Sequence, residues 1–386
     1  MTNLFNTYNR YPIELVDGHD FHLIDDSGKE YVDLASGIGV MSFGYKNPII
    51  SQSVEKQLKK IWHVSNLYQS SPQEIVAGKL SKLVGFDCLT FFANSGTEAN
   101  EAALKIAHKY TGRRKVMTFN NSFHGRTYGS LTVTDYPGIK EGFFVDQTDV
   151  VVASYNDFSS LSLLDDSFAA CIVEMIQGEG GVNLIKADWL KQLAKKIKAY
   201  GGLLIIDEVQ TGIGRTGKAF AFQHYSIQPD IITIAKALGA GLPVGAMIGK
   251  SELGSAFTPG SHGSTFGGNL LAMASANAVL SLITPELLKQ VESKGQLFLS
   301  LLKDQLLGCG QVLDVRGQGL MIGIQLDSSL SITTIIKDLQ RAGYLTISSK
   351  HNTLRLLPPL IIDKKNLASA SEAIALAIKM QIGISR

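Results

Sequence analysis

Seven short apolar runs, separated by longer stretches with a helical pattern, most constrain the fold of this chain. They lie at Leu89–Phe92, Lys115–Phe119, Val150–Ala153, Ala170–Glu174, Leu203–Asp207, Ile231–Ile234 and Gly245–Ile248. Most are apolar on both faces, which is typical of a mostly parallel sheet covered by helices on both sides. Between them, Gly96–Tyr110 and Asp188–Tyr200 have helical periodicity. The alternation predicts an α/β doubly wound unit.

The two ends of the chain have a different pattern. Residues Phe21–Leu34 predict a hairpin, with a polar Asp-Asp-Ser-Gly turn between two apolar runs. From about Pro285 onward, helical stretches alternate with strand-like runs, which predicts an α+β unit near which the hairpin should pack. We therefore expect a large domain over residues 61–280, and a smaller domain built from residues 1–60 and 281–386.

Composition and charge exclude several classes of protein. The chain has 386 residues, 45% of them hydrophobic, and a formal net charge of +2, which argues against a nucleic-acid surface. The apolar stretch Ile231–Gly249 approaches the roughly 20 residues of a membrane span, but it contains Lys236, Pro243 and several glycines. No secretory signal is evident, and the three widely spaced cysteines predict reduced thiols in a cytoplasmic protein. No metal-ligand spacing stands out, so we predict no metal.

Lys236 is the only charged residue in that apolar stretch. Burial disfavours the ammonium form and leaves a nucleophilic amine, which is what Schiff-base chemistry with an aldehyde requires. Taken alone, such a lysine is more often structural, with an amine that reaches the surface. Asp207, however, ends an apolar run upstream. A lysine for an aldehyde carbon and an acid for a pyridinium nitrogen together suggest pyridoxal phosphate.

Two further motifs follow predicted strands. Gly96 and Thr97 open a predicted helix, whose free N–H groups make them candidates for binding a phosphate. An ordinary capping box at Ser95 and Glu98 explains the same residues. In the next motif, Phe123 can stack on a flat cofactor and Arg126 can bind a carboxylate, whereas we assign His124 a packing or hydrogen-bonding role.

Three more polar segments are candidates for a ligand site. Glu179 lies in a glycine-rich loop after a strand, where ligands bind in open α/β sheets, although a surface glutamate is the simpler reading. Ser264 and Thr265 offer hydroxyls to a phosphate or substrate, in what is otherwise a connecting loop. Arg355 precedes two prolines and is a candidate partner for Glu179 or for a second carboxylate.

Together these motifs resemble the class III aminotransferases, which have the fold type I pyridoxal-phosphate architecture. The resemblance runs from Tyr31 to Arg355, with the motifs in the family's order. It implies pyridoxal 5'-phosphate as cofactor, an amino donor and 2-oxoglutarate as substrates, and a homodimer with shared active sites. The chain departs from the family at Met175, at Gly44–Pro48 and at Ala237, none of which is a predicted cofactor contact.

The resemblance also implies a role for each candidate. Lys236 would be the Schiff-base lysine and Asp207 the partner of the ring nitrogen. The remaining cofactor contacts would be Gln210 at the ring hydroxyl, Val209 and Phe123 on the ring faces, Gly96 and Thr97 at the phosphate, and Thr265 from the neighbouring subunit. Substrate would meet Arg126 through its α-carboxylate, Ser264, and the switch pair Glu179 and Arg355.

The amino donor is the least constrained part of the prediction. Family members that act on ornithine carry a tyrosine where this chain has Ile38, and an apolar residue there suits an acylated amine. We therefore favour N-acetyl-L-ornithine, with ornithine, succinyl-diaminopimelate and 4-aminobutyrate as alternatives. Two other classes remain: a nicotinamide-dependent dehydrogenase, for which Arg316–Gly319 offers only an incomplete fingerprint, and a non-catalytic protein that retains the fold.

Overall fold

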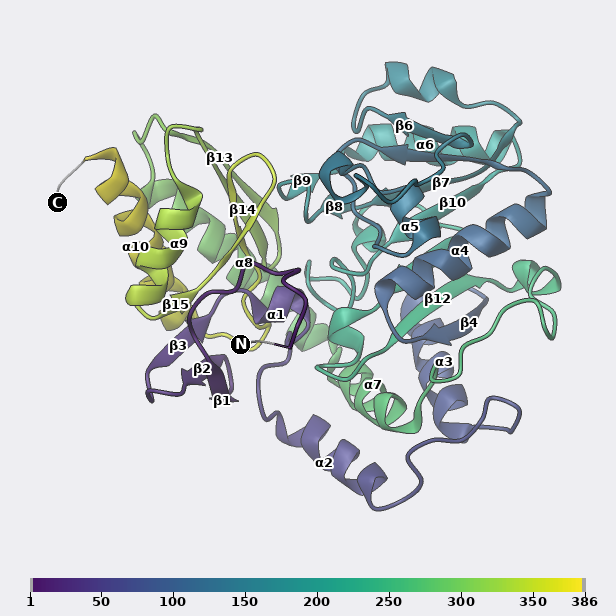
Figure 1. The fold of residues 1–386 in the computed structure, drawn as a ribbon, viewed down its shortest axis with the longest axis horizontal. Helices are drawn as coiled ribbons and strands as arrows, with labels where there is room; N and C mark the ends of the chain where they lie inside the picture. The colour runs from purple at the N-terminus through teal and green to yellow at the C-terminus, as the bar shows by residue number, and fades with distance from the viewer. Residues whose placement is uncertain (1–2, 384–386) are drawn as a thin grey trace.

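The computed structural model describes residues 3–383, and within them a seven-stranded sheet forms the core of the larger group of elements, on the right in Figure 1. Its strands are β4 (Cys88–Ala93), β5 (Lys115–Phe119), β6 (Val150–Ala153), β7 (Phe168–Glu174), β10 (Leu203–Asp207), β11 (Ile231–Ile234) and β12 (Gly245–Lys250). Their order is β4-β12-β11-β10-β7-β5-β6, and only β12 runs antiparallel to its neighbours. The predicted α/β class and all seven predicted strands are confirmed.

Helices bury both faces of this sheet. On one face, the alanine-rich side of α4 (Gly96–Thr111) shares an apolar cluster with Ile205 and Ile231. On the other face, Ile206 and Ile232 belong to the larger cluster that includes α3 (Ser71–Val84), α6 (Ala187–Ala199) and α7 (Leu270–Leu282). Neighbouring residues of β10 and β11 thus point into different clusters, which explains why these runs are mostly apolar rather than alternating.

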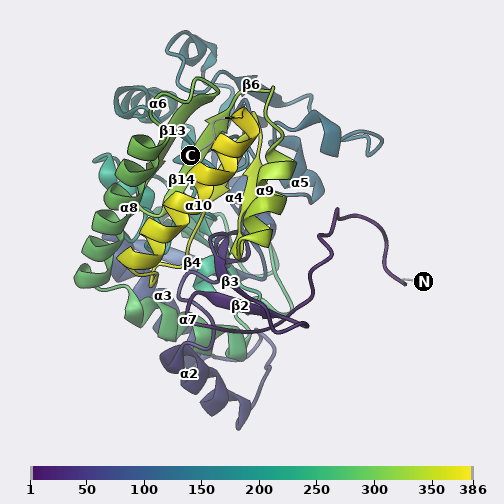
Figure 2. The ribbon, with the colours of Figure 1, turned by 90° about the vertical axis from the view of Figure 1, so that its left-hand side faces the viewer.

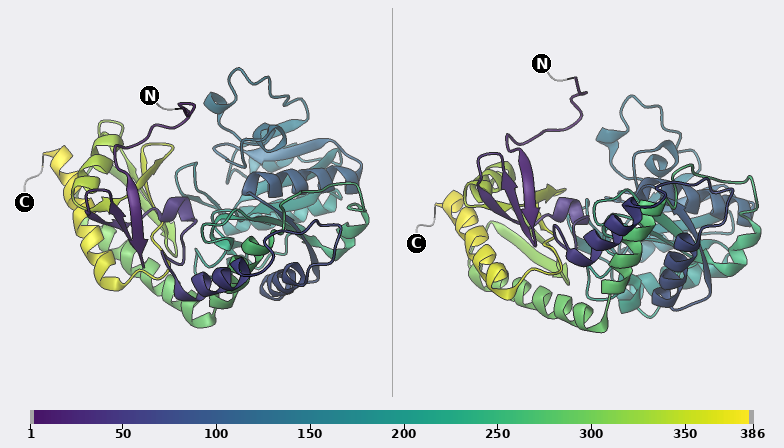
Figure 3. Two further views of the ribbon diagram at one scale, coloured as in Figure 1. Left: turned by 60° about the horizontal axis from the view of Figure 1, so that its bottom comes forward. Right: turned by 90° about the horizontal axis from the view of Figure 1, so that it is seen from below.

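The N- and C-terminal segments form a separate group of elements (Figures 2 and 3). One sheet contains β1 (Leu15–His19), β2 (His22–Asp25), β3 (Glu30–Asp33) and β15 (Tyr344–Leu345), and a second has the order β13 (Val312–Gln318), β14 (Met321–Leu326), β17 (Thr353–Leu356), β16 (Ile347–Ser349). Helices α8 (Pro285–Gln305), α9 (Ile332–Arg341) and α10 (Lys364–Ile382) pack beside them. The parallel pairing of β3 with β15 confirms that the hairpin packs against the C-terminal unit. The domain limits at residues 60 and 280 stay a prediction.

Several elements had no counterpart in the sequence prediction. Strand β1 extends the predicted hairpin to three strands, and α2 (Pro48–Leu58) begins at an Asn47 cap followed by proline. Two short strands, β8 (Ile176–Gln177) and β9 (Asn183–Leu184), flank the loop that carries Glu179. The short helix α1 (Ser36–Gly39) contains left-handed backbone at Gly37 and Ile38. Within the described residues the cysteines are free.

The apolar stretch around Lys236 is not a single helix. It forms β11, a short turn of 3-10 helix at Lys236–Leu238, and β12. In the described part of the chain no single helix is long and apolar enough to cross a membrane, and only α7 and α8 together meet that criterion, as a pair bent by 74°.

One buried arginine links three regions of the chain. The guanidinium of Arg215 donates through Nη1 to the carbonyls of Leu320 (2.9 Å) and Pro358 (2.5 Å), and through Nη2 to the hydroxyl of Ser42 (2.7 Å). Burial lowers the pKa of Arg215 to about 9, while the nearby Asp33 carboxylate raises it. The segment after β10 is thereby joined to both chain ends.

Glu208, which follows the predicted functional residue Asp207, serves the fold. Its carboxylate accepts hydrogen bonds from the Thr211 hydroxyl (2.6 Å) and from the N–H groups of Ala221 (3.0 Å) and Phe222 (2.8 Å). Since an amide has one acceptor oxygen, Glu208→Gln leaves at least one buried donor unpaired. We expect the free energy of unfolding to fall by about 1–3 kcal/mol, measured by urea denaturation.

The matched control is the exposed Glu252, whose replacement by glutamine should change stability by less than about 0.5 kcal/mol. Equal stability of the Glu208→Gln variant and the unmodified protein would contradict the structural role of Glu208.

Candidate active site

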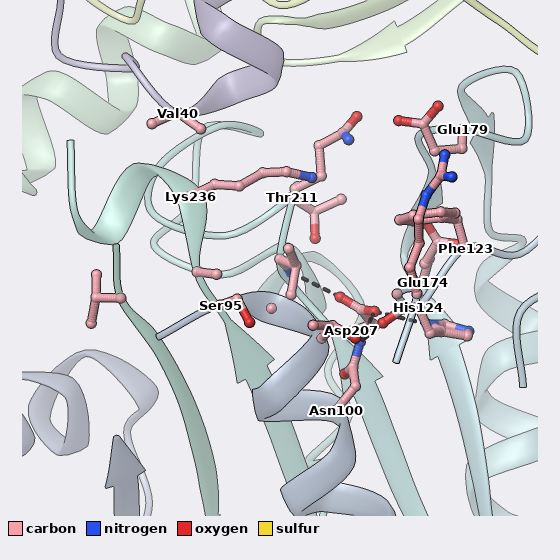
Figure 4. A pocket seen from close by; sticks show the side chains of 18 of the residues that line it. Val40, Ser95, Asn100, Phe123, His124, Glu174, Glu179, Asp207, Thr211 and Lys236 are labelled. Atoms are coloured by element: carbon pink, nitrogen blue, oxygen red, sulfur yellow. Dashed lines mark hydrogen bonds and ion pairs between the residues drawn. The ribbon is translucent and has the colours of Figure 1, made fainter. Parts of the chain in front are cut away.

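A cavity of about 460 Å³ lies where β5, β7, β10 and β11 end (Figure 4). This is the edge of an open α/β sheet at which ligands bind. The cavity brings together nine of the predicted site residues: Gly96, Thr97, Phe123, Arg126, Glu179, Asp207, Val209, Gln210 and Lys236. Three predicted residues, Ser264, Thr265 and Arg355, do not line it.

The carboxylate of Asp207 is fixed at the floor of the cavity. Its Oδ2 accepts hydrogen bonds from Nδ2 of Asn100 (2.9 Å) and Nδ1 of His124 (2.8 Å), and its Oδ1 accepts from the N–H of Val209 (2.9 Å). Asn100 in turn accepts a hydrogen bond from the Thr233 hydroxyl on β11. The arrangement holds a negatively charged group in one orientation and accords with the hydrogen-bonding role assigned to His124.

Lys236 extends into the cavity from the side opposite Phe123 and Glu179 (Figure 4). Burial lowers the pKa of its amine, the nearby Glu179 raises it, and Arg355 lowers it again. Its backbone φ is 48°, a left-handed conformation that costs an ordinary side chain about 1–3 kcal/mol. Strain of this kind at a cavity wall is typical of a functional residue.

The N-terminus of α4 faces the same cavity. The Ser95 hydroxyl caps the helix by accepting from the Glu98 N–H (3.3 Å), so the simple capping explanation holds. Capping leaves the first N–H groups of the helix, at Gly96 and Thr97, available to an anion. A side chain at position 96 would collide with Val209, so glycine is required there. The two interpretations of the motif are therefore compatible.

Glu174, at the end of β7, adds a second buried carboxyl group. It accepts hydrogen bonds from the N–H groups of Phe123 (3.1 Å) and Gly178 (3.3 Å). Burial raises the pKa of Glu174 to about 7, although the nearby His124 opposes this shift. Glu174 thereby positions the backbone that carries Phe123 and the loop that carries Glu179.

Glu179 and Arg355 form an ion pair beside the cavity. Nη1 of Arg355 lies 2.7 Å from Oε1 of Glu179 and also donates to Oε1 of Gln210 (3.2 Å). The Arg355 guanidinium is almost fully buried, whereas the Glu179 side chain is 28% exposed. Glu179 is therefore the partner that can move into water without a large desolvation penalty.

The backbone around Glu179 is held on both sides. Its carbonyl accepts a hydrogen bond from the N–H of Lys350 (3.0 Å). Arg316 donates to the carbonyls of Gly181 (2.5 Å) and Val182 (3.0 Å). If the ion pair with Arg355 breaks, the side chain of Glu179 therefore moves while its backbone stays in place. Arg316, the residue that began the incomplete dinucleotide fingerprint, serves as this tether.

Two predicted substrate contacts have different surroundings. Arg126 is exposed and lines the cavity, and no carboxylate among residues 3–383 forms an ion pair with it. The hydroxyl of Ser264 accepts hydrogen bonds from Asn94 (3.0 Å) and from the Gly267 N–H (2.9 Å), which shapes the loop outside this chain's cavity. Thr265 is exposed on that loop.

The substrate argument based on Ile38 stays a prediction. The segment that contains Ile38 reaches the cavity through Val40, and Ile38 itself is 43% exposed and does not line it. The left-handed backbone at Gly37 and Ile38 turns the chain, so the residue that contacts the cavity is two positions further on.

The residues present fit pyridoxal phosphate. The cavity combines a buried carboxylate, a lysine amine, an aromatic wall at Phe123 and the N-terminus of α4. These are the groups that a protonated ring nitrogen, an aldehyde, an aromatic ring and a phosphate require.

The chain belongs to the family described as Aminotransferase class-III, whose sequence model matches residues 6–378. Enzymes of this family are pyridoxal-phosphate-dependent transaminases, so the predicted enzyme class and cofactor are confirmed.

Individual members of the family are also similar to this chain. The chain is 48% identical to the acetylornithine aminotransferase of Lactiplantibacillus plantarum over 97% of this chain and 96% of that protein. It is 46% identical to the acetylornithine aminotransferase of Bacillus subtilis, with 98% of each covered. Among solved structures, the ornithine aminotransferase of Toxoplasma gondii superimposes with a TM-score of 0.94 at 30% identity, covering 98% of this chain and 93% of that one.

Two residues of the Asp207 network were missing from the sequence prediction. Asn100 and Thr233 lie within regular elements, where a polar residue carries no local motif. The available signal was their burial: both occupy positions that the periodicity of α4 and the apolar character of β11 place in the core. A polar residue predicted in the core implies a buried partner.

The lowered pKa of Lys236 generates a prediction. Its neutral amine should be abundant at a lower pH than that of an ordinary lysine, whose pKa is about 10.4. After removal of the cofactor, the rate at which pyridoxal phosphate restores the yellow absorbance should therefore reach half its maximum below that pH. Glu179→Gln removes the charge that most raises the pKa and should move the midpoint lower still.

The control is Glu252→Gln, an exposed substitution outside the cavity, which should leave the midpoint unchanged. A midpoint near 10.4 in the unmodified protein would contradict a perturbed amine.

Proposed function

We propose that this chain moves the terminal amino group of N-acetyl-L-ornithine to 2-oxoglutarate, giving N-acetyl-L-glutamate 5-semialdehyde and L-glutamate, as in arginine biosynthesis. The observation that carries the proposal is the near full-length identity of 46–48% to proteins named acetylornithine aminotransferase. The amino group leaves one substrate before the second binds, so the reaction follows a ping-pong order.

The cofactor supplies the aldehyde that combines with amines and the ring that accepts an electron pair. In this proposal Lys236 anchors the cofactor and, once released, its neutral amine carries a proton from the donor carbon. Burial of the amine, which lowers its pKa, supports that role because a proton carrier must start neutral. Asp207 would keep the ring nitrogen of the cofactor protonated, and the hydrogen bonds from Asn100 and His124 hold the Asp207 carboxylate in place.

The two substrates share one cavity but differ in their carboxylates. Arg126, exposed and unpaired in the described residues, is suited to the α-carboxylate of either substrate. Glu179 forms an ion pair with Arg355. While the acylated donor is bound, this pair keeps the Arg355 charge neutralised. When 2-oxoglutarate enters, its second carboxylate replaces Glu179 at Arg355. A single side-chain movement then serves both half-reactions.

A panel of amino donors with 2-oxoglutarate tests the proposal. N-acetylornithine should give the highest kcat/KM, compared with ornithine, succinyl-diaminopimelate and 4-aminobutyrate. Lys236→Ala should abolish turnover and the yellow absorbance. If ornithine were preferred, the substrate assignment would be wrong, although the class would stand.

The switch pair generates a second prediction. Arg355→Gln should raise the KM for 2-oxoglutarate by roughly 10- to 100-fold, because a hydrogen bond to a charged group contributes about 1.5–3 kcal/mol. The single-turnover reaction with N-acetylornithine should keep its rate. Arg114→Gln, which removes an exposed arginine paired only with Asp149, is the control. An equal loss in both half-reactions would contradict a switch at Arg355.

We also propose that the chain acts as a cytoplasmic homodimer in which Thr265 of one subunit binds the cofactor phosphate of the other. Its exposure outside its own chain's cavity supports this role. Lys236→Ala and Thr265→Asp should each be nearly inactive, yet co-expression should restore activity, because the mixed dimer contains one intact site. No recovery in isolated mixed dimers would contradict the sharing of Thr265.

A further inference from the structure

Two histidines and a glutamate, none of which lines the cavity, converge on one face of the N-terminal sheet. His19 ends β1 and His22 begins β2, and the two are paired directly across a tight turn. Glu30 begins β3 opposite Ile24, two residues from His22 and therefore on the same face. The three side chains come from three neighbouring strands.

The potential ligand atoms lie close together. Oε1 of Glu30 is 3.0 Å from Nε2 of His19 and 3.8 Å from Nδ1 of His22, and all three atoms lie within 4.8 Å of one another. Ligands at about 2.0–2.2 Å from a tetrahedral Zn²⁺ ion are separated by roughly 3.3–3.5 Å. Small rotations of exposed side chains bridge the difference.

Hydrogen bonding within the protein does not account for the whole cluster. His19 can pair with Glu30, but Nδ1 of His22 is buried and has no hydrogen-bond partner among the described residues. A buried ring nitrogen without a partner is uncommon and calls for a ligand. It lies 3.8 Å from the same carboxylate oxygen that His19 contacts.

The surroundings favour a cation. Oδ2 of Asp20 lies 3.5 Å from the other ring nitrogen of His19, where a carboxylate typically orients a metal-bound histidine. The turn itself is fixed, because Asp20 exchanges two backbone hydrogen bonds with Tyr45. With His19 and Glu30 about half exposed, an ion can enter from solvent and keep water as its fourth ligand.

We propose that His19, His22 and Glu30 form a binding site for a late first-row divalent cation, with Zn²⁺ the best match to two imidazoles and one carboxylate. This proposal departs from the sequence prediction of no metal, because the His-x-x-His spacing becomes a candidate ligand pair only when the turn brings the two strands together. The bound ion ties β1, β2 and β3 to one another and is separate from the transamination chemistry.

The test uses the full-length protein with its cofactor bound, after treatment with a chelator. Calorimetric titration with Zn²⁺ should show one more ion per chain in the unmodified protein than in His19→Gln, whose exposed side chain can change without disrupting the fold. His351→Gln removes an exposed histidine outside the cluster and should bind as the unmodified protein does. Asp20→Asn should weaken binding by about 10-fold or more.

Two further measurements identify the ligands. Co²⁺ should give the visible bands of a four-coordinate ion in the unmodified protein and in His351→Gln, but not in His19→Gln. Zn²⁺ should raise the Tm of the unmodified protein and of His351→Gln, but not that of His19→Gln. Equal Zn²⁺ stoichiometry in the unmodified protein and His19→Gln, whether zero or one, overturns the proposal, as does loss of the ion in His351→Gln.

Discussion

The carboxylate of Asp207 is the group around which the cavity is organised. It lies at the end of a central strand, almost inaccessible to water, and receives three hydrogen bonds from three different segments. Each donor is itself fixed, Asn100 by α4 and Thr233, and His124 by the backbone after β5. A buried charge is tolerated only with such support, so its position dictates how α4, β5 and β10 must meet.

Most of the fold and much of the cavity followed from the sequence because two kinds of local information sufficed. Strands such as Ile231–Ile234 are apolar on both faces, and this pattern specifies a sheet buried by helices. Residues such as Asp207 and Glu179 follow those strands, so topology alone brings them together. The contact of Val40 with the cavity did not follow, because the chain there has a left-handed backbone at Gly37 and Ile38 that periodicity does not encode.

In this site the backbone is held in place, whereas the Glu179 side chain is free to move. Lys236 occupies a strained conformation that the surrounding core must maintain, and the loop of Glu179 is tethered by Lys350 and Arg316. The Glu179 side chain, by contrast, is partly in water. An amino donor and a keto acid can therefore be accommodated in turn by the Glu179 side chain without a change in the positions of Lys236 and the Glu179 backbone.

The buried guanidinium of Arg215 has a consequence for how the molecule comes apart. It donates to the carbonyls of Leu320, between β13 and β14, and of Pro358, after β17, and to the hydroxyl of Ser42, while belonging to the segment that leaves β10. If the segment of Ser42 or the segments of Leu320 and Pro358 moved away, the buried guanidinium would lose hydrogen-bond acceptors. The segments around Ser42, Leu320 and Pro358 therefore cannot separate from the segment after β10 without this cost, and the two groups of elements should lose their structure in one cooperative transition.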